Sequence, residues 1–553
     1  MLHLSKAPPL PERTLRPPRT IVAILLCFIL GEEPARGESE PRDSRLERLP
    51  ARGESEPRDS RLERLPTRGE SEPRDSRLER LEEDLARLRK NAQTRDSELK
   101  KLRDEVASLR ATSARTRPRA ASSPGISSER GDSRRRAGRR PALPGPCAPR
   151  RWRDAAMPID GWSTKVGPGT LRIWRFGFDL DLAAGLGLEK GARVHALTSG
   201  SVDPRPNAIT LQGADLSFSA SYEPYFDAFL NLSLSIDAEG DSVLGLEEAW
   251  LRSARFAAGL LQVKAGRFFT PFGLFNRLHL HDWTWQTQPV IASRVLGPDG
   301  HSGVGLDLNV KLPLPWHCVL TAGLQDPRGA TQYSFLASQD SFEARPIGGR
   351  AWREVAVQGM DKLVYLARLS NRIPIGKAAS LGLGGSALFG PSAAGDGART
   401  TIVGADLSLR IEHKRIGLVA LCAEYMHRIL VIPEDPALAL AADRLEDFGI
   451  YAQGIWFPIQ RLGLGLRYEW ATGRGQSVGE YPSRELDPYR GDRSRISPLI
   501  VFYVVRLARL KLQYNHDRAA FLPGKGEAHS FFLSASWSFG LGGPEHFGKD
   551  EDE

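Results

Sequence analysis

The chain has 553 residues, of which 41% are hydrophobic, and a formal net charge of +9. Its mean hydropathy of −0.33 excludes a helical membrane protein, and its length predicts at least two regions. Residues 1–159 carry 36 Lys and Arg against 25 Asp and Glu, whereas the remainder carries 40 against 42. The basic character therefore belongs to the N-terminal part, which disfavours a nucleic-acid-binding role for the rest of the chain.

The N-terminal residues 1–34 are predicted to be a secretory signal sequence. The apolar run from Ile21 to Leu30 is shorter than the about 20 residues that a membrane-spanning helix needs, and three arginines precede it. A 16-residue unit, ARGESEPRDSRLERLP, then occurs three times with small changes at its ends. Each copy is rich in charge and poor in apolar residues, so residues 35–77 are predicted to be a solvated spacer.

Residues 78–111 carry leucines at heptad spacing, including Leu78, Leu85 and Leu99 at one seam position. This spacing predicts a self-associating coiled coil, and a single solvated helix is the alternative. Residues 112–160 are rich in Arg, Pro and Ser and are predicted to be a flexible linker. Contact of this basic linker with acidic envelope polymers and simple solvation both remain open.

Residues 161–543 are predicted to form an all-β transmembrane antiparallel barrel of about 16 strands, followed by an acidic tail at 544–553. From Phe226 to Ile236 every second residue is apolar, and similar alternation recurs along this region. Such a strand has one face for hydrocarbon and one for water, as in a soluble sandwich or a membrane barrel. Short connections at 223–225, 312–316 and 413–415 alternate with long ones at 269–302, 326–358, 427–446 and 471–494. This asymmetry favours the outer-membrane barrel.

A stretch of about 110 residues also resembles a known family. The segments LSFSASYEPYFDAFLNLSLSIDAEG, LEEAW, KAGRFFTPFGLFNRLHLHDW and VLGPDGHSGVGLDL occur between Leu216 and Leu324. Their order is similar to that in Gram-negative outer-membrane porins related to the phosphate-selective porins O and P. The resemblance implies a 16-stranded, trimeric outer-membrane channel. It does not imply phosphate as the solute, because the family's arginine ladder and lysine cluster are not recognisable in this sequence.

The long connection after Arg267 is predicted to fold inward and narrow the pore, where its charged groups set the solute preference. Cationic side chains there would favour anions, although ion pairs of Arg267 and Asp282 that pin the loop to the wall are an alternative. With an unperturbed imidazole pKa of about 6.5, anion preference is expected to rise as the pH falls from about 7.5 to about 5.5. The candidate constriction residues are Lys264, Arg267, Arg277, His279, His281, Asp282 and Arg294.

Catalysis is not predicted. Glu247 and Glu248 are adjacent, and adjacent strand residues point to opposite faces, so the two carboxylates are not expected to converge for acid–base chemistry. Metal binding by His279 and His281 is not favoured, and the sequence implies neither a metal nor a cofactor.

The predicted function is therefore that of an outer-membrane porin. It would let small hydrophilic solutes, including anions such as phosphate, diffuse passively through a homotrimer in the outer-membrane lipid of a Gram-negative cell. The N-terminal segment would lie in the periplasm. The alternative is an envelope-tethering barrel, in which the coiled coil and basic linker contact the periplasmic cell wall.

Overall fold

The computed structural model describes residues 162–541 apart from 190–191, 237–239, 435–440 and 506. The predicted signal sequence, repeats, coiled coil, linker and acidic tail lie outside the described residues. None of the described helices is long and apolar enough to cross a membrane.

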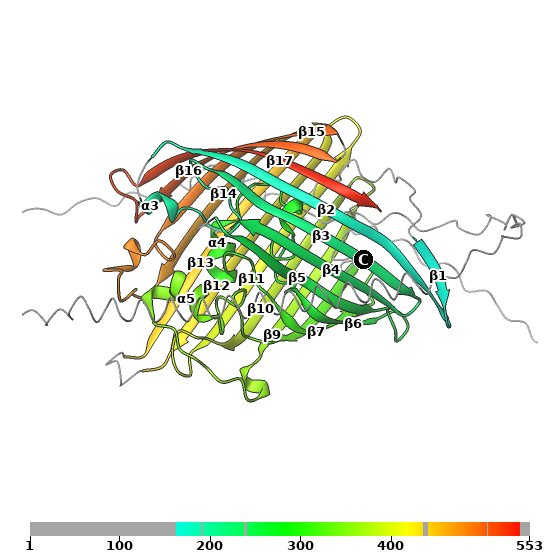
Figure 1. Ribbon diagram of the computed structural model, residues 1–553, viewed down its shortest axis with the longest axis horizontal. Coiled ribbons are helices and arrows are strands. Elements are labelled where there is room, and N and C mark those ends of the chain that lie inside the picture. Colours follow the sequence, from blue (N-terminus) through cyan, green and yellow to red (C-terminus); the bar gives the residue numbers. More distant parts are fainter. Residues whose placement is uncertain (1–161, 190–191, 237–239, 435–440, 506, 542–553) are drawn as a thin grey trace, which may run out of the picture. The chain divides into compact units, whose positions relative to one another are not determined.

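Seventeen strands form one sheet, and sixteen of them, β2 to β17, close into an antiparallel barrel (Figure 1). Each strand pairs with the next along the chain, and β17 closes the ring by pairing with β2, from Ser530↔Gly187 to Leu541↔Phe176. The additional strand β1 pairs with the start of β2. The strands are β1 (Trp162–Val166), β2 (Gly169–Gly187), β3 (Ile209–Glu223), β4 (Phe226–Ile236), β5 (Ser242–Ser253), β6 (Leu261–Phe269), β7 (Ser302–Lys311), β8 (His317–Gln325), β9 (Val364–Ile375), β10 (Ala379–Pro391), β11 (Arg399–His413), β12 (Gly417–Ile432), β13 (Asp443–Ile459), β14 (Leu462–Arg474), β15 (Arg493–Val505), β16 (Ala508–Ala519) and β17 (Glu527–Leu541).

Short helices lie in the connections between strands. They are α3 (Ala192–His195), η2 (Leu280–Asp282), α4 (Val290–Leu296), α5 (Gln339–Ala344), η3 (Ile347–Gly349), η4 (Met360–Lys362) and η6 (Arg484–Leu486). Two of them, η2 and α4, belong to the connection between β6 and β7, which spans residues 270–301 and is called the lumen loop below.

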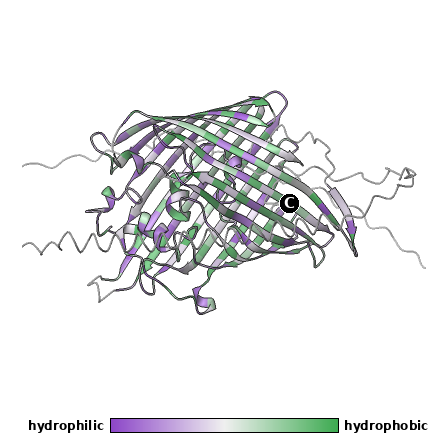
Figure 2. Ribbon diagram, in the orientation of Figure 1, coloured by the Kyte–Doolittle hydropathy of each residue, from purple (hydrophilic) through white to green (hydrophobic). Residues whose placement is uncertain are grey.

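The outer face of the barrel is apolar and the inner face is polar. On β16, Leu510 and Leu512 are exposed, whereas Lys511 and Gln513 between and beyond them are buried. The same alternation runs along β17, where Phe531 and Leu533 face outward, and Figure 2 shows it as alternating colours along the strands. A closed ring with an apolar exterior satisfies its backbone hydrogen bonds internally, as a membrane-spanning structure must. The fold is therefore a transmembrane β-barrel, as the alternation predicts.

The connections differ at the two ends of the barrel. Pro224 and Tyr225 alone join β3 to β4, whereas the lumen loop and residues 326–363 form long excursions at the opposite end. The predicted loop at 427–446 is too long, because β12 continues to Ile432 and β13 begins at Asp443, so the connection is 433–442. The asymmetry between the two ends of the barrel is confirmed.

Candidate pore constriction

The lumen loop crosses the inside of the barrel. Its Trp285 indole donates a hydrogen bond to the carbonyl of Ser497 on β15 at 2.9 Å, and the backbone N–H of Val290 donates to Glu469 on β14 at 2.6 Å. At its other end, the N–H of Gly273 donates to Ser386 on β10 at 3.2 Å. Contacts with strands this far apart in the ring place the loop in the lumen, where α4 is seen in Figure 1.

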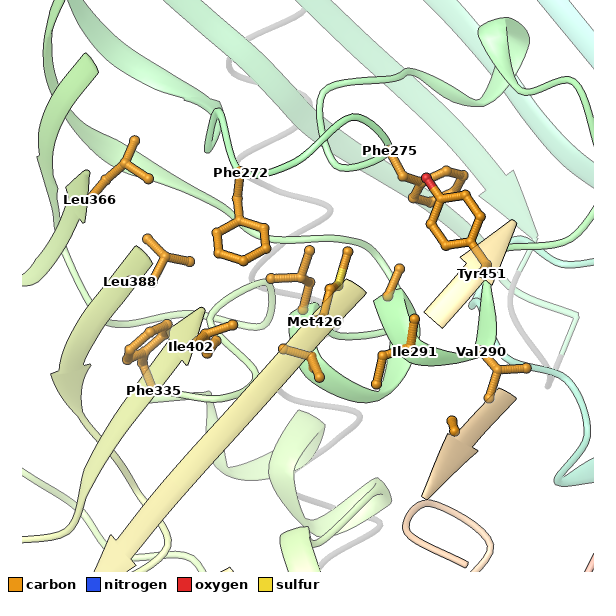
Figure 3. Close-up of a cluster of buried hydrophobic side chains, with 14 of the residues drawn as sticks. Phe272, Phe275, Val290, Ile291, Phe335, Leu366, Leu388, Ile402, Met426 and Tyr451 are labelled. Carbon is orange, nitrogen blue, oxygen red and sulfur yellow. The ribbon is translucent and has the colours of Figure 1, made fainter. Parts of the chain in front are cut away.

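An apolar cluster holds one side of the lumen loop. Its aromatic and aliphatic side chains pack against inward-facing residues of β9 to β13 and against Phe335 of the following long connection (Figure 3). Burying each large apolar side chain contributes about 1.5–3 kcal/mol, so several together fix the loop firmly. The labelled members are Phe272, Phe275, Val290, Ile291, Phe335, Leu366, Leu388, Ile402, Met426 and Tyr451.

A carboxylate fixes the start of the loop. The backbone N–H groups of Leu274 and Phe275 each donate to Glu424 on β12 at 3.3 Å, and the Tyr451 hydroxyl donates to it at 2.8 Å. Gly273 has a φ of +61°, and a Cβ atom there would overlap the Glu424 carboxylate. The loop can approach β12 this closely because residue 273 is glycine.

A second contact of the loop is made by His279, which lies between two carboxylates. Its Nδ1 is 2.9 Å from Glu247 and its Nε2 is 3.1 Å from Glu248. Both glutamates face inward because β5 has an irregular register: Asn231 pairs with Glu248 and Leu232 with Leu246, so Glu247 is an extra residue. The expectation that these adjacent carboxylates diverge is wrong, and the cause is this bulge.

His281 occupies a parallel position against the neighbouring strands. Its Nδ1 is 3.1 Å from Asp215 on β3 and 3.9 Å from Asp179 on β2, and its Nε2 is 3.9 Å from Asp282. The rings of His279 and His281 stack with centroids 5.6 Å apart and planes 7° apart. We call this group the acid–histidine cluster; it comprises Asp179, Asp215, Glu247, Glu248, His279, His281 and Asp282.

The carboxylates change the acid–base behaviour of His279. Burial by itself disfavours the imidazolium, but its hydrogen bonds to the carboxylates of Glu247 and Glu248 outweigh burial and hold the pKa of His279 well above its usual value of 6.5. This shift moves the titration of His279 towards higher pH, whereas the expected rise in anion preference between about pH 7.5 and about 5.5 rests on an unperturbed imidazole.

The predicted cations of the constriction occupy different environments. The ammonium of Lys264 lies over the rings of Trp250 and Phe268, at 5.0 and 4.5 Å from their centroids. Arg267 donates from Nε to the Leu246 carbonyl at 2.8 Å and from Nη2 to Thr331 of the next long connection at 3.3 Å. These contacts attach the end of β6 to β5 and to the long connection that follows β8.

The remaining two arginines lie on the loop itself. Arg294 in α4 is buried and donates to the carbonyls of Arg490 and Gly491 at 3.0 and 2.9 Å, and burial lowers its pKa to about 10. Arg277 is partly exposed. Arg267 and Arg294 thus make fixing contacts to carbonyl and hydroxyl groups.

Other inward-facing cations were missed by the sequence analysis. Arg493 and Arg495 on β15 share Asp517, while Arg509 and Lys511 on β16 donate to the carbonyls of His281 and Trp283 in the lumen loop. Each pair is spaced two residues apart, which puts both members on one strand face. Basic residues two apart in a strand whose other residues are apolar could have identified these inward-facing cations from the sequence.

These elements together define a transmembrane β-barrel whose lumen is crossed by a long, firmly held loop. No known protein-family model matches the chain. An uncharacterized protein of Aquifex aeolicus is 24% identical over 336 residues, which cover 59% of this chain and 67% of that protein.

Several solved structures are also similar to the chain. The outer-membrane channel DcaP of Acinetobacter baumannii aligns with a TM-score of 0.46 and 12% identity, covering 69% of this chain and all of that one. The anion-selective porin of Comamonas acidovorans aligns with a TM-score of 0.40 and 9% identity, over 67% of this chain and 100% of that one. Outer-membrane-expressed OmpT of Vibrio cholerae aligns with a TM-score of 0.40 and 11% identity, over 68% of this chain and 100% of that one.

Proposed function

We propose that the chain is an outer-membrane porin that lets small hydrophilic solutes diffuse down their gradients. The observation that carries the proposal is the closed sixteen-stranded ring with a polar interior and a long loop folded into it. A loop held at both walls narrows a lumen without moving during transport, which suits passive diffusion. Short turns at one end are typical of the periplasmic side of such barrels, so the N-terminal segment would be periplasmic.

We infer that the solutes include anions, such as phosphate, and that the loop sets this preference. Charged groups in a narrow passage act more strongly than on an open rim, because the effective dielectric is lower there. Arg277 is the loop cation best suited to meet solute, since it is partly exposed while Arg294 is buried against backbone carbonyls. Assembly as a homotrimer is part of the same proposal.

Planar-bilayer recordings of the purified full-length protein test this function. We expect steady ohmic conductance, and a reversal potential in a salt gradient that indicates anion preference. Arg277→Glu should move the reversal potential towards cations, whereas Arg294→Gln should leave its sign unchanged. No conductance at all would refute the porin, and equal reversal potentials for wild type and Arg277→Glu would refute the role of Arg277 alone.

The alternative is a barrel that anchors an envelope tether, with the coiled coil and basic linker contacting the cell wall. The apolar cluster favours it, because hydrophobic packing between the lumen loop and β9 to β13 fills part of the interior. A folded barrel that inserts into bilayers without conducting, and whose N-terminal segment binds isolated cell wall, would support this alternative.

A further inference from the structure

Two histidines and a glutamate gather on the outer face of the barrel, away from the lumen. His516 on β16 and His529 on β17 are directly opposite each other in the strand register. Glu527 lies two residues before His529 on the same face. Within the part of the chain that the structure describes, this is the one group of three whose ligand atoms all lie within 4.8 Å of one another.

On β16 and β17 the exposed apolar residues end at this site. His516 is near the end of β16 and His529 near the start of β17, at the end of the barrel that carries the long connections. Further along the same face, Leu512 and Phe531 are exposed apolar residues. The three side chains are partly buried.

We propose that His516, Glu527 and His529 bind a divalent transition metal ion, with Zn²⁺ as the best match. Two imidazoles and one carboxylate, leaving a fourth position for water, form a common zinc ligand set. The Nε2 of His516 and the nearer oxygen of Glu527 are 4.0 Å apart. Zinc bonds of about 2.0–2.2 Å bring tetrahedral ligands to about 3.4 Å from one another, so small side-chain rotations close the site.

Neighbouring residues orient these ligands. The hydroxyl of Tyr514 is 2.6 Å from Nδ1 of His529, which leaves Nε2 for the metal. Arg518 contacts one oxygen of Glu527 at 2.9 Å, and the other oxygen is the one nearer His516. Among the described residues, the buried Nε2 of His516 has no hydrogen-bond partner. Partners such as Tyr514 and Arg518, on the far side of His529 and Glu527, are typical of metal sites.

Calorimetric titration of the folded full-length barrel with ZnCl₂ tests the proposal. We expect wild type to bind one more Zn²⁺ per chain than the double variant His516→Gln/His529→Gln, with both proteins keeping the mobility of a folded barrel on gels. His427→Gln is the matched control. His427 is also partly exposed near the long-connection end, but it faces a single carboxylate, Glu446, at 3.2 Å, and Phe448 across the strands.

Two further measurements separate this site from weak surface binding. Co²⁺ should give the visible absorption of a tetrahedral site in wild type and His427→Gln, and lose it in the double variant. Tyr514→Phe should weaken Zn²⁺ binding by about 10-fold or more, because it removes an orienting hydrogen bond. Identical Zn²⁺ isotherms for wild type and the double variant would overturn the proposal.

Discussion

The carboxylates of Glu247 and Glu248 favour the protonated, charged form of His279. Glu247 and Glu248 contact opposite nitrogens of its ring, so loss of the proton leaves two carboxylates facing a neutral imidazole. Because the pKa of His279 is raised in the folded protein, its contacts with Glu247 and Glu248 contribute their full stability below the unfolded pKa of about 6.5. The contribution is lost as the pH rises through the higher folded pKa.

The first prediction concerns this pH dependence. His279→Gln should lower the free energy of unfolding near pH 6 by about 3–5 kcal/mol, the usual cost of removing one partner of a buried ion pair. As the pH rises above the unfolded pKa of about 6.5 and through the higher folded pKa, the difference from wild type should shrink, because wild type loses the proton there. Urea unfolding at several pH values measures this. His413→Gln, at an exposed histidine that ends β11, should change nothing; a constant difference across the range would contradict the prediction.

The lumen loop is held to the barrel wall by contacts that are spread along its length. It is bonded to Glu424 at its start, to the acid–histidine cluster in the middle, and to Glu469 where α4 begins. All seven residues of α4 are buried. A change at one contact should therefore loosen part of the loop and leave the barrel wall intact.

The second prediction tests the contact at Gly273. Gly273→Ala should displace the Glu424 carboxylate and free the start of the loop, in addition to the about 1–2 kcal/mol that a left-handed backbone costs a non-glycine residue. Single-channel recordings should show larger current fluctuations. Gly524→Ala is the matched control, since Gly524 has a φ of +67° and no atom within 4 Å of its added Cβ. Equal current fluctuations in the two variants would show that the contact with Glu424 does not hold the loop.

The strands could be predicted from the sequence, and most contacts of the loop could not. Alternation is a local signal with a period of two, so β4, β16 and β17 are recognisable from their own residues. The bulge at Glu247 is one inserted residue that this period does not reveal. Likewise, the bond between Val290 and Glu469 joins residues 179 positions apart, and their sequence neighbourhoods contain nothing that pairs them. The sequence predicts that the loop folds inward. The residues that it contacts could be identified only from the closed barrel, because they are far away in the sequence.

The barrel places its apolar and polar residues on opposite faces of one continuous wall. Strand β17 completes this wall by pairing with β2, so no unpaired edge remains between them. A charged substitution on the outer face should thus lower the free energy of unfolding little near the rim and much more midway along the strands. The depth dependence of that cost distinguishes a lipid-facing wall from an exterior that meets water.

The last prediction measures this depth dependence. Leu533 lies midway along β17 and Phe539 lies near its end, on the side of the short turns, and both side chains are exposed on the outer face. In lipid vesicles, Leu533→Lys should lower the free energy of unfolding by about 2–4 kcal/mol, whereas the charge that Phe539→Lys introduces near the rim should cost only about 0–1 kcal/mol. Urea titration followed by tryptophan fluorescence gives both values, and gel mobility before and after heating reports the folded fraction. Similar costs at the two positions would mean that the middle of this face does not lie in hydrocarbon, and the assignment of the barrel to a membrane would fail.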